Sequence, residues 1–277
     1  MESRIEIHET AFVTSTFRST CESLSRDPFS RLWNNEKTDV WVASYLREVS
    51  TEEPYTHCIR NRYFLDTIEA LVEKNQVEVL INFGCGFSMY PFLLPEQILH
   101  IEIDKADVVE HKRSKVQDWQ NQGLLPERNI HYIGVDFNEA YQDELSKKIA
   151  ALKSGKSSFI LLEGVLFFLN KEVTEMLFNL FSTLQHRGDY VGSVSYKGAV
   201  ARTPVFKRLL HFFTDKLLQG QALDYQTLED DFYTSLPGYQ LLDSQDYFTL
   251  SAKYAHQPLA AEKEEVLNET YYLLQKT

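Results

Sequence analysis

Apolar residues along the chain follow two different periods, and the change falls near residue 76. Before it, apolar positions recur every three or four residues over 39–49 and 56–74, which is the spacing of amphipathic helices. After it, short continuous apolar runs alternate with helical patterns, as is typical of buried parallel strands joined by crossover helices. The pattern predicts a helical cap over 1–75 and an α/β core from residue 76.

The core pattern predicts five strands and the helices that join them. Strands are expected over 77–83, 98–103, 129–135, 158–162 and 189–196, and helices over 106–120, 139–152 and 171–186. No repeat, low-complexity segment or linker divides the chain, so a single domain over 1–277 is expected, with the core spanning 76–196.

The remaining segments complete a mostly parallel seven-stranded sheet with helices on both faces. Residues 197–235 interrupt the alternation with a helical pattern over 201–218. An insertion here serves either as a lid over a site or as a helix that stabilises the sheet. Residues 236–277 predict an antiparallel strand pair over 239–242 and 248–255, followed by a helix over 262–274.

Glycines and carboxylates follow four of the predicted strands. The first strand ends in a turn with Gly84 and Gly86, where the missing Cβ atoms let the backbone approach a ligand. The next three end in Asp104, Asp136 and Glu163. Each acid has a plainer explanation, since Asp136 could cap the following helix. Together they predict a binding site, because open α/β sheets bind ligands beyond the carboxyl ends of their strands.

The spacing in this turn indicates the kind of ligand. Asp104 lies twenty positions after Gly84, the distance at which an acid accepts hydrogen bonds from a ribose. The third glycine of a dinucleotide fingerprint is missing, because Phe87 and Ser88 follow Gly86. The pattern therefore favours a nucleoside without phosphates.

Two arginines precede the core on the helix predicted over 56–74. Arg60 and Arg62 are either solvated or paired with Glu52, Glu53 and Asp66, and spacing alone favours this interpretation. Alternatively, one of them reaches the glycine turn and binds a carboxylate of the ligand, since a guanidinium group matches a carboxylate bidentately.

Composition excludes several classes of partner. The net charge of −12 argues against nucleic acid, which requires concentrated Lys and Arg. Three cysteines without C-x-x-C spacing suggest reduced thiols, not disulfides or a zinc site. No apolar run reaches membrane-spanning length, and residues 1–10 lack the layout of a signal peptide. We expect a cytoplasmic protein with a small-molecule substrate, no metal and no membrane partner; the oligomeric state stays open.

An ordered set of motifs runs through most of the chain up to the fourth strand. They are Arg18, Glu22 and Asp27-Pro28 near the start, Arg60 to Asp66, Asn82-Phe83-Gly84-Cys85-Gly86, Glu102-Ile103-Asp104 with Lys112, Val135-Asp136-Phe137, and Glu163-Gly164-Val165-Leu166. This set resembles the leucine carboxyl methyltransferase family of class I S-adenosylmethionine-dependent methyltransferases, including bacterial small-molecule O-methyltransferases. The chain departs from the family pattern at Phe87-Ser88 and at Phe168, where the family often has Tyr.

The resemblance implies a Rossmann-like fold and S-adenosylmethionine as cofactor, with roles at the matching positions. The implied contacts are Gly84 and Gly86 along the methionine part, Arg60 on its carboxylate with help from Arg18, Glu163 near its amine, Asp104 on the ribose, and Asp136 and Phe137 on the adenine.

The expected reaction is O-methylation of a small acidic molecule, a carboxylate or an ionisable hydroxyl, in secondary metabolism. A carboxylate is already ionised at neutral pH, whereas a phenol with a pKa of about 10 gains from a general base. No histidine lies in the strand-end turns, so His211 in the lid segment is the one to test and the catalytic residues are unknown. The alternatives are carboxyl methylation of a protein C-terminus, other chemistry on the sulfonium, and a binding module without activity.

Overall fold

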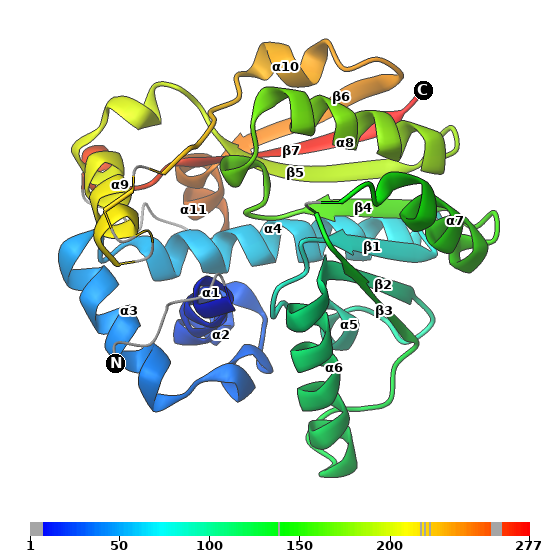
Figure 1. Ribbon diagram of the computed structural model, residues 1–277, viewed down its shortest axis with the longest axis horizontal. Coiled ribbons are helices and arrows are strands. Elements are labelled where there is room, and N and C mark those ends of the chain that lie inside the picture. Colours follow the sequence, from blue (N-terminus) through cyan, green and yellow to red (C-terminus); the bar gives the residue numbers. More distant parts are fainter. Residues whose placement is uncertain (1–7, 138, 217, 219, 222, 256–261) are drawn as a thin grey trace.

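A seven-stranded sheet in the order β3-β2-β1-β4-β5-β7-β6 forms the centre of the computed structural model (Figure 1), which describes residues 8–137, 139–216, 218, 220–221, 223–255 and 262–277. The strands are β1 (Val79–Phe83), β2 (Leu99–Lys105), β3 (Ile130–Val135), β4 (Ser158–Leu162), β5 (Tyr190–Tyr196), β6 (Tyr239–Asp246) and β7 (Glu269–Lys276). The first five strands are parallel, whereas β7 runs antiparallel to both β5 and β6. The predicted mostly parallel sheet is confirmed.

Helices precede the sheet and connect its strands. They are α1 (His8–Thr20), α2 (Glu22–Ser25), α3 (Glu36–Glu48), α4 (Glu53–Glu73), α5 (Tyr90–Leu93), α6 (Ala106–Asn121), α7 (Gln142–Lys153), α8 (Lys171–Leu184), α9 (Pro204–Lys216), α10 (Asp230–Thr234) and α11 (Tyr247–Ala255). Short 3-10 turns are η1 (Ser30–Trp33), η2 (Leu166–Phe168), η3 (Val200–Arg202) and η4 (Lys263–Glu265). The helices predicted between strands agree with these bounds to within a few residues.

The C-terminal elements differ from the prediction. Residues 248–255, expected as a strand, belong to helix α11, whose buried Tyr247, Leu250 and Ser251 recur at helical spacing. Residues 262–274, expected as a helix, contain the start of β7, which lies between β5 and β6. The aromatic and apolar run of β7 is buried on both faces of the sheet, so it lacks the alternation that identifies a half-exposed strand.

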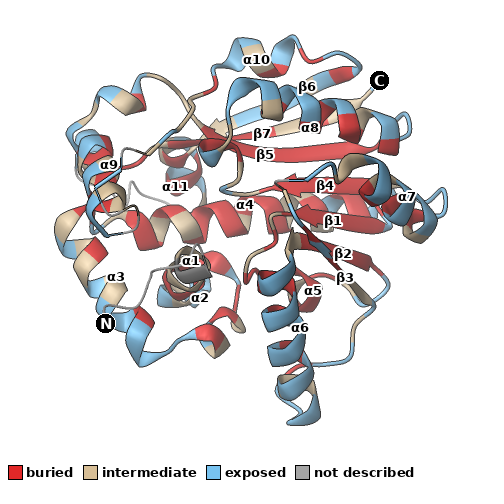
Figure 2. Cartoon of the chain, in the orientation of Figure 1, coloured by how far each residue is buried: buried red, intermediate tan, exposed pale blue. Residues whose placement is uncertain are grey.

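Alternating residues of the central strands enter two apolar cores. Ile81 and Ile160 face the core shared with α7 and α8, whereas Leu80 and Phe159 face the core shared with α4 and α11. Figure 2 shows the central strands and α4 as buried, while α6 exposes much of its length. Because helices cover both faces of the sheet, ligands reach it at the ends of its strands.

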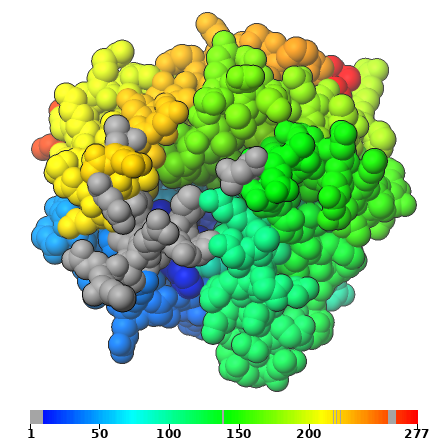
Figure 3. All heavy atoms as spheres, viewed as in Figure 1, coloured from blue at the N-terminus to red at the C-terminus, as the bar shows by residue number. Residues whose placement is uncertain are grey.

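The N-terminal helices lie on the side of the sheet toward which the parallel strands point (Figure 1). A third apolar core joins Phe17 of α1, Tyr45 of α3 and Phe206 of α9. Figure 3 shows the yellow segment with α9 above the blue N-terminal residues on this face. The segments predicted as cap and lid therefore share one core.

A buried histidine on β2 should make stability depend on pH. His100 is fully buried and neither ring nitrogen has a hydrogen-bond partner among the described residues; burial, with Lys112 and Arg128 adding to it, lowers its pKa to about 3. Because the unfolded chain binds the proton near pH 6.5, this contribution is intact above that pH. It is lost as the pH falls toward 3, by at most about 1.4 kcal/mol per pH unit.

We expect the unfolding free energy of His100→Leu to fall less steeply between pH 6 and pH 4 than that of the unmodified protein. Urea denaturation measures this difference. The exposed His211 provides the control, because His211→Leu should leave that slope as in the unmodified protein. Equal slopes for His100→Leu and the unmodified protein would contradict the assignment.

Candidate active site

The glycine turn after β1 is held against the end of β2. The amides of Gly84 and Cys85 both donate to the Ile103 carbonyl, at 2.8 and 3.0 Å, and the Gly86 amide donates to Asp104 Oδ2 at 2.8 Å. Gly84 has φ +77°, and a Cβ built on it would lie 2.3 Å from Val165 Cγ2. Glycine is therefore required here for both the backbone conformation and the space.

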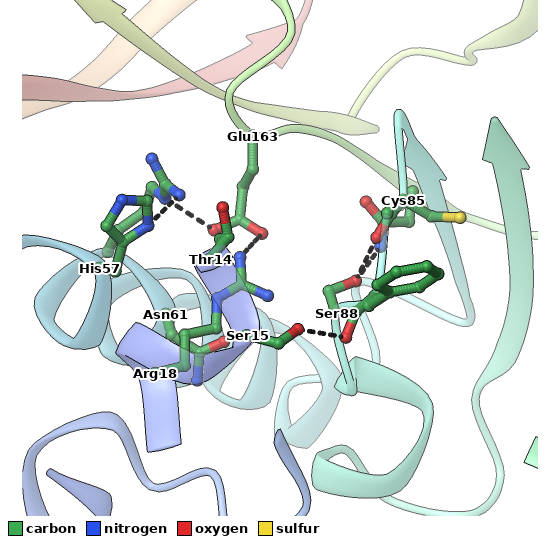
Figure 4. Close-up of polar contacts among 12 residues, drawn as sticks. Thr14, Ser15, Arg18, His57, Asn61, Cys85, Ser88 and Glu163 are labelled. Atoms are coloured by element: carbon green, nitrogen blue, oxygen red, sulfur yellow. Dashed lines mark hydrogen bonds and ion pairs between the residues drawn. The ribbon is translucent and has the colours of Figure 1, made fainter. Parts of the chain in front are cut away.

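A buried network of polar side chains supports this turn. The Asn82 amide donates to Ser88 Oγ at 2.8 Å, and Ser88 Oγ donates to the Cys85 carbonyl at 2.9 Å (Figure 4). Behind it, Lys112 on α6 forms an ion pair of 2.5 Å with Glu102 on β2, and both side chains are about 1% exposed or less. These contacts fix the shape of the turn through the packing of α6.

Asp104 occupies the position predicted for it. Its two carboxylate oxygens accept from the Gly86 and Lys105 amides, each at 2.8 Å. Burial raises the pKa of Asp104, and the two amide hydrogen bonds oppose that shift. The carboxylate is thus held at the end of β2 beside the glycine turn.

Two buried arginines converge on Glu163 at the end of β4. Figure 4 shows Glu163 extending from the sheet toward Arg18 of α1. Arg18 Nη2 lies 3.1 Å from Glu163 Oε2, and Arg60 Nε of α4 lies 3.5 Å from Glu163 Oε1. Arg18 and Arg60 lie 145 and 103 positions before Glu163 in the sequence, yet the structure brings all three together with side chains at most 5% exposed.

Asp136 and Phe137 stand beyond the end of β3, on the outer part of the same sheet edge. Asp136 is exposed, and its carbonyl accepts from the Glu139 amide at 3.2 Å. Phe137 is half-buried, with its ring centroid 5.7 Å from Phe83 and 5.3 Å from Tyr141. Both residues therefore lie at the predicted edge.

The sequence interpretation missed Glu269 and His57 beside Arg60, although it named Glu53 among the possible partners of this arginine. Arg60 Nη1 donates to Glu269 Oε1 at 2.5 Å, and Arg60 Nη2 donates to His57 Nδ1 at 2.6 Å. His57 Nε2 lies 3.5 Å from Glu53 Oε2. Glu269 was missed because its segment was expected to be helical, and the helical spacing of 53, 57 and 60 on α4 was the one signal for His57.

Two other candidates lie elsewhere. Arg62 Nε bonds both oxygens of Asp66, four positions on, at 2.8 Å, which is the plainer of the two roles considered for it. His211 is exposed on α9, 3.2 Å from Asp215. The structure gives His211 no contact with the strand ends.

The structure bears on two expectations drawn from composition, namely those for the cysteines and for membrane-spanning helices. Cys21, Cys58 and Cys85 are free thiols, and the latter two are buried. Within the described ranges, no helix has the length and apolar character to cross a membrane.

This strand order, with crossover helices and a glycine turn facing an acid across β1 and β2, is the Rossmann-like fold of class I methyltransferases. The chain matches the family model "Leucine carboxyl methyltransferase" over residues 16–182, which is more than half of its 277 residues. It belongs to that family. S-adenosylmethionine is accordingly its cofactor, as expected from the motifs.

Solved structures agree on the fold across nearly the whole chain. A "putative methyltransferase" from Thermobifida fusca YX covers 100% of this chain and 96% of its own, with TM-score 0.65 and 12% identity. A DUF574 family protein from Streptomyces avermitilis covers 97% of both chains, with TM-score 0.62 and 9% identity. Magnesium protoporphyrin IX methyltransferase from Synechocystis PCC 6803, with bound S-adenosylhomocysteine, covers 95% and 99%, with TM-score 0.51 and 12% identity. No curated protein sequence matches the chain.

The strand-end residues fit the amino-acid part of S-adenosylmethionine. Arg18 Nε is buried and has no hydrogen-bond partner among the described residues, and the buried Arg60 Nε and Glu163 Oε1 face each other at 3.5 Å without a hydrogen bond. A zwitterion supplies a carboxylate for guanidinium donors and an ammonium group for a carboxylate acceptor. The donor and acceptor set present at the edge therefore suits that group.

Proposed function

We propose that this protein transfers a methyl group from S-adenosylmethionine to an oxygen atom of a small acidic molecule, a carboxylate or an ionisable hydroxyl, in secondary metabolism. The observation that carries the proposal is the pairing of Arg18 and Arg60 with Glu163 beside the glycine turn. Family membership supports methyl transfer, and the choice of oxygen and of a small acceptor is our inference.

In this proposal the strand ends hold the cofactor in the order of the strands. Arg60, assisted by Arg18, binds the methionine carboxylate, and Glu163 binds its amine. The backbone at Gly84 and Gly86 lies along the methionine part, and Asp104 accepts hydrogen bonds from the ribose hydroxyls. Asp136 and Phe137 contact the adenine.

When bound, the cofactor supplies a methyl group already activated on a sulfonium. The chain's own task is to align the acceptor oxygen with that group and to exclude water. Arg18 reaches Glu163 from α1, so the N-terminal helices form part of the site wall. We propose that residues 1–75 act as a cap and 197–235 as a lid, and that the enclosure favours small acceptors over a protein C-terminus.

The proposal is tested with methyl-labelled S-adenosylmethionine and three acceptor sets: small carboxylic acids, small phenols, and a peptide ending in a free leucine carboxylate. We expect label in a small acid or phenol and none in the peptide. Label in the peptide alone would overturn the small-acceptor assignment. S-adenosylhomocysteine or other cofactor products accumulating without any acceptor would indicate different chemistry on the sulfonium.

We expect Asp104→Ala to weaken S-adenosylhomocysteine binding by about 10- to 100-fold, since hydrogen bonds to a charged group contribute about 1.5–3 kcal/mol each. Calorimetric titration measures this affinity. Asp107→Ala, three residues further along and exposed, is the matched control and should bind as the unmodified protein does. An unchanged affinity in Asp104→Ala would remove Asp104 from the site.

A further inference from the structure

The strand order divides the site edge into two halves at the boundary between β1 and β4. The half formed by β1, β2 and β3 carries the glycine turn, Asp104 and Asp136. The other half continues through β4, β5 and β7, and at the same edge it carries Glu163, Tyr196 and Glu269, because Tyr196 pairs with Glu269 in the β5–β7 register. Nothing in the cofactor assignment uses Tyr196 or Glu269.

Behind this second half lie two buried carboxylates that are only half satisfied. Glu269 is 4% exposed; Oε1 accepts from Arg60, Oε2 makes no hydrogen bond of normal geometry with the described residues, and the buried Tyr271 hydroxyl faces the carboxylate. Glu53 is 3% exposed; Oε2 accepts from the Tyr45 hydroxyl at 3.0 Å, and Oε1 has no partner in the same set. A buried acceptor without a partner costs about 1–3 kcal/mol of stability, so a hydrogen-bond donor that reaches these oxygens would be stabilising.

The charges around these carboxylates indicate which chemical group can enter. Arg18 and Arg60 are the buried cations of the cluster, and they face three carboxylates: Glu163, Glu269 and Glu53. The pKa of His57 lies well below its usual value, through burial and then through the facing Arg60 and Arg18, so the ring is neutral at pH 7. Burial raises the pKa of Glu53 to about 8, so at pH 7 Glu53 is protonated and the two arginines balance Glu163 and Glu269. A further carboxylate here would have no cation left to pair with, and an ammonium group would have no unbalanced carboxylate, whereas a hydroxyl group would supply a donor without adding charge.

From this geometry we infer that the acceptor substrate presents a hydroxyl group to Glu269 and Glu53, and that Glu269 Oε2 takes its proton during methyl transfer. The inference rests on the proposed function and narrows it from acids in general to ionisable hydroxyls. Glu269 is assigned the proton because it contacts Arg60, which in turn contacts Glu163 at the strand end.

The step balances in atoms and charge. The acceptor O–H bond breaks and its proton moves to Glu269 Oε2 while its oxygen forms a bond to the methyl carbon. The bond between methyl and sulfur breaks, and its electron pair stays on sulfur, giving the methyl ether and S-adenosylhomocysteine. The proton then leaves Glu269 for solvent.

The ionisation of the two carboxylates agrees with this role. Burial raises the pKa of Glu269, opposed by Arg60, with Glu163 raising it further and Tyr271 lowering it. Burial and the facing Glu269 raise the pKa of Glu53 to about 8, while Tyr45 and Arg60 oppose the shift. Tyr196 also faces both carboxylates, which raise the pKa of its own phenol. A base whose pKa lies closer to the working pH takes a proton more readily.

The test uses three probes that share one ring and differ in one group: phenol, benzoate and benzylamine. Each is titrated into the full-length protein saturated with S-adenosylhomocysteine, before and after Glu269→Gln and Glu53→Gln. We expect phenol to bind more tightly than benzoate or benzylamine, and each substitution to weaken phenol at least tenfold. Glu264→Gln, an exposed change on the same C-terminal segment, is the matched control and should leave phenol affinity unchanged.

The outcomes separate this inference from the proposed function. If S-adenosylhomocysteine does not bind the unmodified protein, the proposed function fails. If it binds but benzoate or benzylamine exceeds phenol, if phenol does not bind, or if both Gln variants bind phenol normally, the inference alone is overturned. Circular dichroism and urea denaturation of the Gln variants establish that they fold. Where phenol is methylated, an acid limb in kcat/KM that disappears in Glu269→Gln supports the proton transfer.

Discussion

Replacing Gly84 with alanine should destabilise the protein by about 2–5 kcal/mol and weaken S-adenosylhomocysteine binding more than tenfold. The backbone contribution is about 1–2 kcal/mol, because φ at Gly84 is +77°, a conformation that residues with a Cβ disfavour. The rest is steric, about 1–3 kcal/mol, because the new Cβ would lie 2.3 Å from Val165 Cγ2. Urea denaturation and calorimetric titration measure the two effects.

Gly155 offers a matched control for this change. It also has φ +77°, but a Cβ there would meet nothing within 4 Å. Gly155→Ala should therefore show the backbone cost alone, with no change in S-adenosylhomocysteine affinity. Adding Val165→Ala to Gly84→Ala should recover part of the steric cost. Equal effects at Gly84 and Gly155 would mean that the contact with Val165 is not what requires glycine.

Replacing Lys112 with methionine should cost about 3–5 kcal/mol of unfolding free energy, because it leaves Glu102 as a buried, uncompensated charge. The glycine turn should loosen as well, since Glu102 also accepts a long hydrogen bond from the Asn82 amide at 3.4 Å. We therefore expect weaker S-adenosylhomocysteine binding, although Lys112 lies behind the turn. Urea denaturation and calorimetry again provide the measurements.

Lys148 on α7 is the control for a surface pair. It bonds Glu144 at 2.6 Å, but both side chains are more than half exposed, so Lys148→Met should cost less than about 1 kcal/mol. Adding Glu102→Leu to Lys112→Met should restore much of the lost stability, since an apolar pair avoids the unpaired charge. If Lys112→Met behaves like Lys148→Met, the buried ion pair does not contribute as described.

The sequence predicted the part of the candidate site that consists of the ends of parallel strands. A buried strand shows as an apolar run, and the residue after it must lie at the sheet edge. Gly84, Asp104 and Glu163 were placed in this way, and the parallel register of β1 with β2 and β4 brings them to one edge. Their particular cofactor contacts stay predictions, as do the cap and lid roles of 1–75 and 197–235.

The part of the site that we propose faces the acceptor could not be predicted in this way. Glu269 lies at the start of an antiparallel strand. This strand is buried on both faces of the sheet, so its sequence lacks the alternation of apolar and polar residues that identifies a strand, and the segment was predicted to be a helix. Spacing suggested local partners for Arg60, yet its partners in the structure include Glu269, 209 positions away. No local pattern reports a contact between segments that far apart.

The amino-acid sequence by itself determined the alternation of strands and helices, the glycine turn and the acids that follow the strands. These depend on local propensity and on which residues must be buried, both of which are readable along the chain. The tertiary structure alone decided that Arg18 and Arg60 meet Glu163 and that Glu269 pairs with Arg60. Their meeting depends on how α1, α4 and β7 pack against the end of β4, and burial then changes the ionisation of groups that look ordinary in the sequence.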